Sequence, residues 1–115
     1  MDTRTKIINT AEAAKVSSSG ARVVSGYFDP LIAVHAERLA ELKSDGVKLL
    51  VLIATPENAI LPAAARAELV AGLRTVDYVS ELAPGLDSQI HLEPEDDRRF
   101  QALLERVHAR QMAAS

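Results

Sequence analysis

Short apolar runs alternate along this chain with segments in which apolar positions recur at helical spacing. The apolar runs are typical of strands covered on both faces, and they span residues 21–28, 48–55, 77–82 and 89–93. The segments with helical spacing span residues 3–16, 29–44, 62–75 and 94–111. Strands that alternate with helices predict an α/β domain built on a parallel sheet with right-handed crossovers.

The turn after the first predicted strand carries the clearest boundary signal. Asp29 is expected to cap the free backbone N–H groups of the next helix, and Pro30 fits its first turn because the missing N–H would be unpaired there. Asp29 could also contact a ligand, although capping explains it fully. Ligands of parallel sheets bind beyond the carboxyl ends of the strands, so residues 26–35 are the expected place for one.

Composition indicates one small globular domain, residues 1–115, with an aliphatic core. Hydrophobic residues make up 48% of the sequence and aromatic residues only 3%. The net charge of −3 gives no electrostatic reason to expect a nucleic-acid partner. There is no apolar run long enough to span a membrane, no signal-peptide layout and no cysteine. We therefore expect a cytoplasmic protein with no membrane partner.

Residues 26–35 resemble the nucleotide-binding turn of the cytidylyltransferase-like nucleotidyltransferases. The family pattern is G-x-F-D-x-x-H-x-G-H, and this chain reads G-Y-F-D-P-L-I-A-V-H. A second stretch, L-P-A-A-A-R at 61–66 followed by L-R-T-V-D-Y-V at 73–79, is similar to a segment of the same superfamily. The pattern is closest to that of enzymes that activate sugar phosphates or glycerol phosphate with ATP or CTP. The resemblance covers most of residues 5–82.

The resemblance implies a Rossmann-like three-layer sandwich, in which helices cover both faces of a short parallel sheet. It implies a reaction that joins a nucleoside monophosphate to a phosphorylated substrate and releases pyrophosphate, usually with Mg²⁺. The residues that it marks as candidates for nucleotide binding are Gly26, Tyr27, Phe28, Asp29, His35 and Arg66.

The chain departs from the family pattern at the positions that handle phosphate. Ile32 stands in place of the first histidine and cannot donate a hydrogen bond, and Val34 replaces a glycine. Removing one preorganised donor typically slows such chemistry by roughly a hundredfold to a thousandfold. The extended substrate loop is reduced to residues 55–60, and no basic, Ser/Thr-rich phosphate-binding segment follows residue 82.

Two retained residues have alternative interpretations. His35 could contact a phosphate, or it could be a structural histidine on a helical stripe with Leu31 and Leu39. The absence of its partner histidine favours the structural interpretation. Arg66 could reach a phosphate or pair with a carboxylate such as Glu57, and the sequence does not separate these two roles.

The last predicted helix combines an acidic start with an apolar stripe. The acidic residues are Glu93, Glu95, Asp96 and Asp97. Because helix N-termini attract carboxylates, the helix dipole explains this cluster better than a metal site. The stripe is apolar except at its end and comprises Phe100, Leu103, Leu104, Val107 and Gln111. His91 and His108 are expected to be isolated surface residues.

These observations leave three hypotheses for function. The first is a degenerate nucleotidyltransferase-like domain that is catalytically inactive and retains at most weak binding of a nucleotide or small phosphorylated ligand. The second is an active, divergent enzyme using Mg²⁺ with ATP or CTP, in which Arg66, Lys43 or a partner subunit replaces the missing donors. The third is a structural or regulatory subunit whose last helix docks against a partner or a second copy. The exposed edges of a short parallel sheet make a homo-oligomer plausible.

Overall fold

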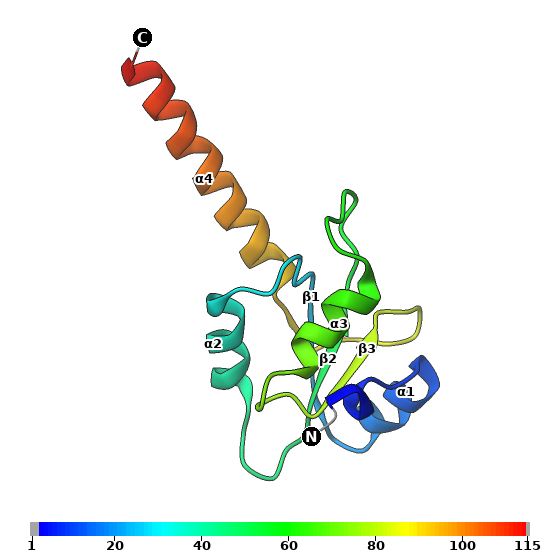
Figure 1. The fold of residues 1–115 in the computed structure, drawn as a ribbon. Helices are drawn as coiled ribbons and strands as arrows, with labels where there is room; N and C mark the ends of the chain where they lie inside the picture. Colours follow the sequence, from blue (N-terminus) through cyan, green and yellow to red (C-terminus); the bar gives the residue numbers. More distant parts are fainter. Residues whose placement is uncertain (1–2, 115) are drawn as a thin grey trace.

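The computed structural model describes residues 3–114 (Figure 1). Its helices are the 3₁₀-helix η1 (Thr3–Lys6) and the α-helices α1 (Thr10–Ser18), α2 (Ala33–Leu42), α3 (Ala63–Ala71) and α4 (Glu93–Ala114). Its strands are β1 (Arg22–Gly26), β2 (Leu49–Ile53), β3 (Tyr78–Glu81) and β4 (Ile90–His91). Each predicted strand is therefore confirmed, with slightly shorter bounds.

The four strands form one parallel sheet in the order β3-β2-β1-β4. Val51 of β2 pairs with Val24 of β1 on one side and with Val79 of β3 on the other. On the far side of β1, Ser25 pairs with His91 of β4. All three pairings run parallel, so the carboxyl ends of β1 and β2 lie at the same edge of the sheet.

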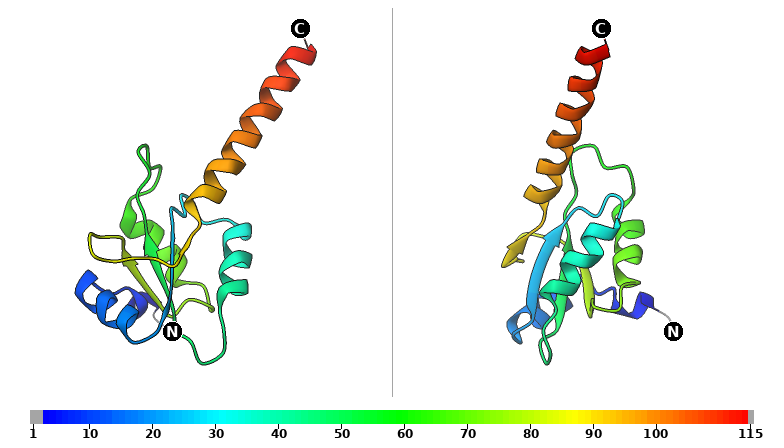
Figure 2. Two further views of the ribbon diagram at one scale, coloured as in Figure 1. Left: turned by 180° about the vertical axis from the view of Figure 1, so that it is seen from behind. Right: turned by 90° about the vertical axis from the view of Figure 1, so that its left-hand side faces the viewer.

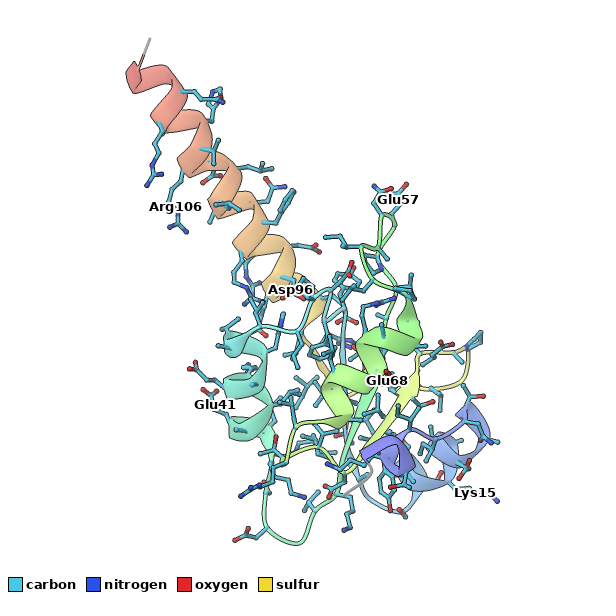
Figure 3. The ribbon with its side chains drawn as sticks, in the orientation of Figure 1. Lys15, Glu41, Glu57, Glu68, Asp96 and Arg106 are labelled. Carbon is cyan, nitrogen blue, oxygen red and sulfur yellow. The ribbon has the colours of Figure 1, made fainter. Side chains whose placement is uncertain are left out.

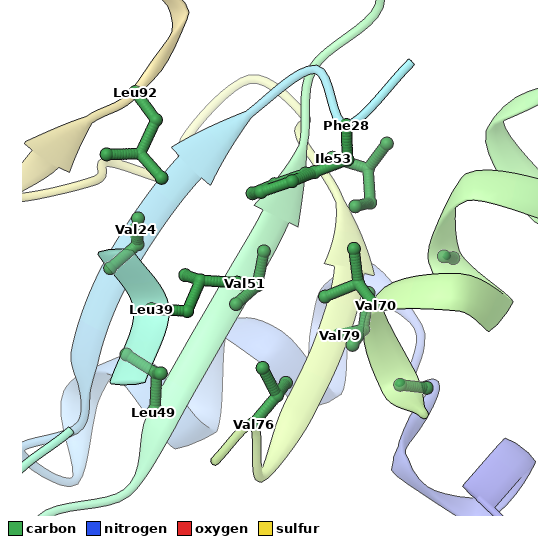
Figure 4. Close-up of a cluster of buried hydrophobic side chains, with 12 residues drawn as sticks. Val24, Phe28, Leu39, Leu49, Val51, Ile53, Val70, Val76, Val79 and Leu92 are labelled. Carbon is green, nitrogen blue, oxygen red and sulfur yellow. The ribbon is translucent and has the colours of Figure 1, made fainter. Parts of the chain in front are cut away.

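Helices cover both faces of the sheet, and side chains of β2 alternate between them. Leu49, Val51 and Ile53 pack with Leu39 of α2 and with Ala67, Val70 and Ala71 of α3 (Figure 4). Leu50 and Leu52 point to the other face, where Ala13 of α1 packs. This period-two burial is what a continuous apolar strand produces between two helical layers. The predicted Rossmann-like three-layer arrangement is thus confirmed.

The predicted leading helix over residues 3–16 is wrong, because the structure splits this segment. Ile7 forms a parallel bridge to Val79, and the Ile8 amide donates to the Val79 carbonyl at 2.9 Å. Asn9 then starts α1, since its Oδ1 accepts from the Glu12 amide at 2.8 Å in a capping box. The Asn-x-x-Glu spacing carried this signal in the sequence.

Two other helices are shorter than their sequence patterns predict. The second begins at Ala33 rather than at the Asp29-Pro30 pair. The third ends at Ala71, and the Gly72 amide closes its last turn by donating to the Glu68 and Leu69 carbonyls. Residues 72–75 then lead into the next strand as a turn rather than as a further turn of helix.

Helix α4 departs from the body and projects well beyond it (Figures 1 and 2). The molecule accordingly measures 57 × 28 × 28 Å along its principal axes. The residues from Asp97 to Gln111 are all exposed, although the sequence places an apolar stripe among them. Within residues 3–114, no helix is both long and apolar enough to cross a membrane.

Candidate functional site

A cleft of about 650 Å³ lies beyond the carboxyl ends of β1 and β2, where parallel sheets bind ligands. It is walled by the turn after β1, the loop after β2 and the start of α4. The residues that line it are Tyr27, Asp29, Pro30, Ile32, His35, Pro56, Glu57, Asn58, Ile60, Asp96, Asp97 and Phe100. Figure 3 shows Glu57 and Asp96 at this end of the molecule. Of the six predicted binding residues, three therefore line the cleft: Tyr27, Asp29 and His35.

Gly26 and Phe28 lie beneath the cleft and shape the turn. Phe28 is fully buried and adopts a positive φ of 50°, which folds its ring back over the end of β1. A Cβ atom on residue 26 would lie 2.7 Å from two carbons of that ring, so only glycine fits there. Both residues therefore have a packing reason that involves no ligand.

Asp29 holds the two loops of the cleft together and does not cap α2, so the predicted cap is wrong. Its carboxylate oxygens accept from the backbone amides of Ile60 at 2.6 Å and Leu61 at 2.7 Å. Ile32 is the residue that precedes α2, and its amide donates to Nδ1 of His35 at 3.1 Å. A carboxylate that reaches more than thirty residues along the chain could not be distinguished by sequence from a local cap.

His35 is buried, with 5% of its surface exposed, and both ring nitrogens have protein partners. Because Nδ1 accepts from Ile32, we assign the proton to Nε2, which donates to Oδ1 of Asp96 at 2.8 Å. Arg99 binds the same Asp96 oxygen. The ring also packs edge-on against Phe28, with centroids 5.3 Å apart. His35 thereby connects the start of α2 to the start of α4.

Arg66 is buried beneath the cleft, with 1% of its surface exposed. Its guanidinium donates to the carbonyls of Leu61 at 3.0 Å, Tyr27 at 3.0 Å and Ala54 at 2.7 Å, and to the Thr55 hydroxyl at 3.2 Å. Among the described residues, no carboxylate forms an ion pair with it, so the predicted alternative of a pair with Glu57 is wrong. Arg66 instead joins the ends of β1 and β2 to the loop before α3.

The walls of the cleft are acidic. Its ionisable groups include the carboxylates of Asp29, Glu57, Asp96 and Asp97, and no lysine or arginine is among the described residues that line it. The pKa of the Tyr27 hydroxyl is raised above its ordinary value of 10.0. Burial is the largest cause, and the negative charges of Asp97, Glu93 and Asp96 raise the pKa further. A phosphate entering this cleft would meet like charges.

Lys43, one predicted replacement donor, lies at the opposite edge of the sheet. Its ammonium donates to Oδ2 of Asp77 at 2.6 Å, and the same oxygen accepts from the amide of Leu49 at 2.8 Å. Partial burial raises the pKa of Asp77, but the hydrogen bonds and the charges of Lys43 and Lys48 outweigh it, so the net pKa is lowered. Asp77 and Leu49 mark the amino ends of β3 and β2, so Lys43 does not reach the cleft.

Sequence reasoning missed a polar network between β1 and β4. Ser25 is buried and lies 3.0 Å from Nδ1 of His91, and its hydroxyl donates to Glu93 at 3.0 Å. Ser88 lies 3.0 Å from both Ser25 and His91. The prediction that His91 is isolated is therefore wrong, because β-pairing brings together residues 66 positions apart. The network fastens the short strand from which α4 starts.

Carboxylates of the acidic cluster bind different protein groups. Glu93 accepts from Ser25, Glu95 pairs with Arg38 at 3.3 Å, and Asp96 binds His35 and Arg99. These contacts fix the first turn of α4 against β1 and α2.

Comparison with known proteins adds no family to this description. The sequence matches no family model, and no curated protein is significantly similar to it. The cytidylyltransferase-like resemblance therefore stays a prediction from residues 26–35 and 61–79.

Proposed function

We propose that this chain is a nucleotidyltransferase-like domain that does not transfer nucleotides. The observation that carries the proposal is the bonding of His35, the one histidine retained in the motif. Its ring donates to Asp96 and accepts from Ile32, so neither nitrogen points freely into the cleft. A transition-state donor has to be directed at the place where charge develops. The ring nitrogens of His35 are instead directed at Ile32 and Asp96 of the same chain.

The other retained groups support the same proposal. Both carboxylate oxygens of Asp29 accept hydrogen bonds from backbone amides. The Arg66 guanidinium donates four hydrogen bonds to neighbouring residues of the chain. Ile32, at the position of the missing histidine, brings an apolar side chain that is 46% exposed. These residues do not fit a magnesium-bound triphosphate. Any nucleotide binding is expected to be weak, because the carboxylates of the cleft repel phosphate.

The proposal is tested by restoring the motif. Wild-type protein and the double variant Ile32→His with Val34→Gly are incubated with ATP or CTP, Mg²⁺ and either a sugar phosphate or glycerol phosphate. Pyrophosphate release and the shift in melting temperature are measured. We expect no release and no saturable shift for the wild type. The variant Ile32→Gln with Val34→Gly is the control, since it relieves the same crowding without supplying an imidazole.

Turnover by the wild type would contradict the proposal. A melting-temperature shift in the histidine variant but not in the glutamine control would show that the cleft still accommodates a triphosphate once a donor returns.

A second candidate function is supported by α4. Four large apolar side chains on this helix are each more than two-fifths exposed: Phe100, Leu103, Leu104 and Val107. A contiguous apolar stripe on a projecting helix is typical of an interaction surface. On this account, the α/β body holds the helix in place and the helix makes the contact.

A further inference from the structure

Three walls of the cleft each contribute one exposed apolar side chain. Ile32 comes from the turn after β1, Ile60 from the loop after β2 and Phe100 from α4. Burial of apolar surface is the main favourable contribution to protein association. The cleft therefore offers a surface for binding that does not depend on the polar groups already bonded within the fold.

The walls that carry these side chains are held in place by hydrogen bonds. Both carboxylate oxygens of Asp29 accept from backbone amides of the loop after β2, and His35 donates to Asp96 at the start of α4. A groove that is fixed before its ligand arrives loses less conformational entropy on binding. The residues retained from the motif thus preorganise a groove between this loop and α4.

Two carboxylates at the mouth of the groove have no partner in the described part of the chain. Glu57 of the loop and Asp97 of α4 line the cleft and are exposed, and neither accepts a hydrogen bond or forms an ion pair there. The other two carboxylates are engaged, because Asp29 accepts from backbone amides and Asp96 binds side chains of α2 and α4. Unpaired negative charges on two walls of one groove attract a cationic group between them.

The arginines farther along α4 lie away from this mouth. With about 100° of rotation per residue, Arg106 and Arg110 lie on one flank of the helix, about 120° and 80° from Phe100. Arg98 lies about 160° from Phe100 on the far face, and Asp97 lies about 60° away on the opposite flank. Figure 3 shows Arg106 on the side of α4 away from the loop after β2. An anionic partner would meet carboxylates at the mouth, so charge complementarity selects a cation.

The apolar surface does not end at the cleft. Leu103, Leu104 and Val107 are exposed and continue from Phe100 along α4 for about 10 Å, at about 1.5 Å per residue. A small molecule held in the cleft would leave these side chains in water. A polypeptide segment is long enough to cover the cleft and the stripe together.

We propose that the cleft and the apolar stripe of α4 together bind a polypeptide segment of a partner protein. A lysine or arginine of that segment lies between Glu57 and Asp97, and its apolar neighbours cover Ile60, Phe100 and the stripe. This inference rests on the interaction role proposed for α4 and specifies the chemistry of the partner.

The first test selects binders of the full chain from a phage-displayed library of random peptides. We expect the selected peptides to carry a lysine or arginine beside leucine, isoleucine, valine or phenylalanine. A selection without an enriched pattern, or one enriched in acidic residues, would overturn the inference. Binding of the chain to phosphatidylserine vesicles in preference to the selected peptides would overturn it too.

The second test measures the affinity of one selected peptide for charge variants by fluorescence anisotropy at low salt. Glu57→Gln with Asp97→Asn removes both unpaired carboxylates and is expected to weaken binding roughly tenfold. Glu37→Gln with Asp45→Asn is the matched control, since it removes the same two charges at exposed positions outside the groove. Equal affinities of the two variants would contradict the inference.

The third test removes the aromatic ring that joins the cleft to the stripe. Phe100→Ser is expected to weaken binding of the same peptide by roughly tenfold, since buried aromatic anchors dominate such interfaces. Ala109→Ser is the control, because it places the same hydroxyl about 180° round the helix from Phe100. A peptide that is sensitive to the charge variant but not to Phe100→Ser would bind the cleft alone, which would overturn the inference.

These outcomes separate the inference from the proposals on which it stands. Selected peptides that are acidic and apolar, and that lose affinity with Phe100→Ser, would preserve the interaction role of α4 and overturn the cationic partner. Pyrophosphate release would instead overturn the proposed lack of catalysis, and peptide binding would still decide the inference.

Discussion

The turn after β1 and the helix α4 use their side chains in opposite ways. In the turn and at the start of α2 that follows it, the polar groups of Asp29 and His35 are hydrogen-bonded to the protein itself. Along α4 beyond Arg99, the described apolar side chains are exposed, and no described charged side chain forms a hydrogen bond or ion pair with the body. The segment that resembles a catalytic motif, residues 26–35, thus stabilises the fold. The exposed surface that is available for binding is the apolar stripe of α4. Sequence resemblance shows which positions correspond to a motif, but the hydrogen bonds of each side chain determine whether it can still contact a ligand.

The largest loss of stability is expected for Arg66→Ala, which tests whether the polar residues around the turn after β1 hold the fold together. The change leaves the carbonyls of Leu61, Tyr27 and Ala54 without their buried donor. We expect the free energy of unfolding to fall by about 3 kcal/mol or more, since each unsatisfied buried group costs about 1–3 kcal/mol. Urea denaturation measures it, and Arg74→Ala, at an exposed arginine, is the control. Equal small effects of both variants would show that Arg66 does not hold the cleft together.

A smaller, pH-dependent contribution to the free energy of unfolding is expected from Asp77, which lies at the amino ends of β2 and β3. Its pKa is lowered in the folded state, so its ionised form stabilises the protein above the ordinary carboxyl pKa of about 3.9. That stability is lost as the pH falls through the lowered pKa. Denaturation measured from neutral pH downward should therefore show a steeper loss in the wild type than in Asp77→Asn. Identical slopes would mean that Lys43 and Leu49 do not favour the carboxylate.

The smallest effect is expected on the other side of the contrast, for Leu103→Glu at protein concentrations where the chain is monomeric. Leu103 is 52% exposed, so its replacement should change the free energy of unfolding by no more than about 0.5 kcal/mol. The same denaturation experiment measures it. A large loss of stability would mean that the stripe packs against the α/β body. It would contradict the distinction between a body that carries the fold and a helix that is free to bind.

The α/β class could be predicted because strands buried on both faces leave continuous apolar runs, as at residues 48–55. The helix starts could be predicted less well. Asn9 carried a capping signal within four residues, whereas Asp29 bonds residues 60 and 61, and no local pattern encodes that. The network of Ser25 with His91 likewise depends on strand pairing. The position of the cleft followed from the topology, but its acidity arises because α4 brings Asp96 and Asp97 beside the turn.

The role of His35 is the central claim, and its ring nitrogens report on it most directly. Nitrogen-15 NMR of the imidazole, recorded with and without ATP or CTP and Mg²⁺, measures which nitrogen carries the proton and whether a ligand reaches it. We predict a proton on Nε2, an unprotonated Nδ1, and signals that do not change as nucleotide is added. A saturable change in the His35 signals of the wild type as ATP or CTP is added would contradict the account.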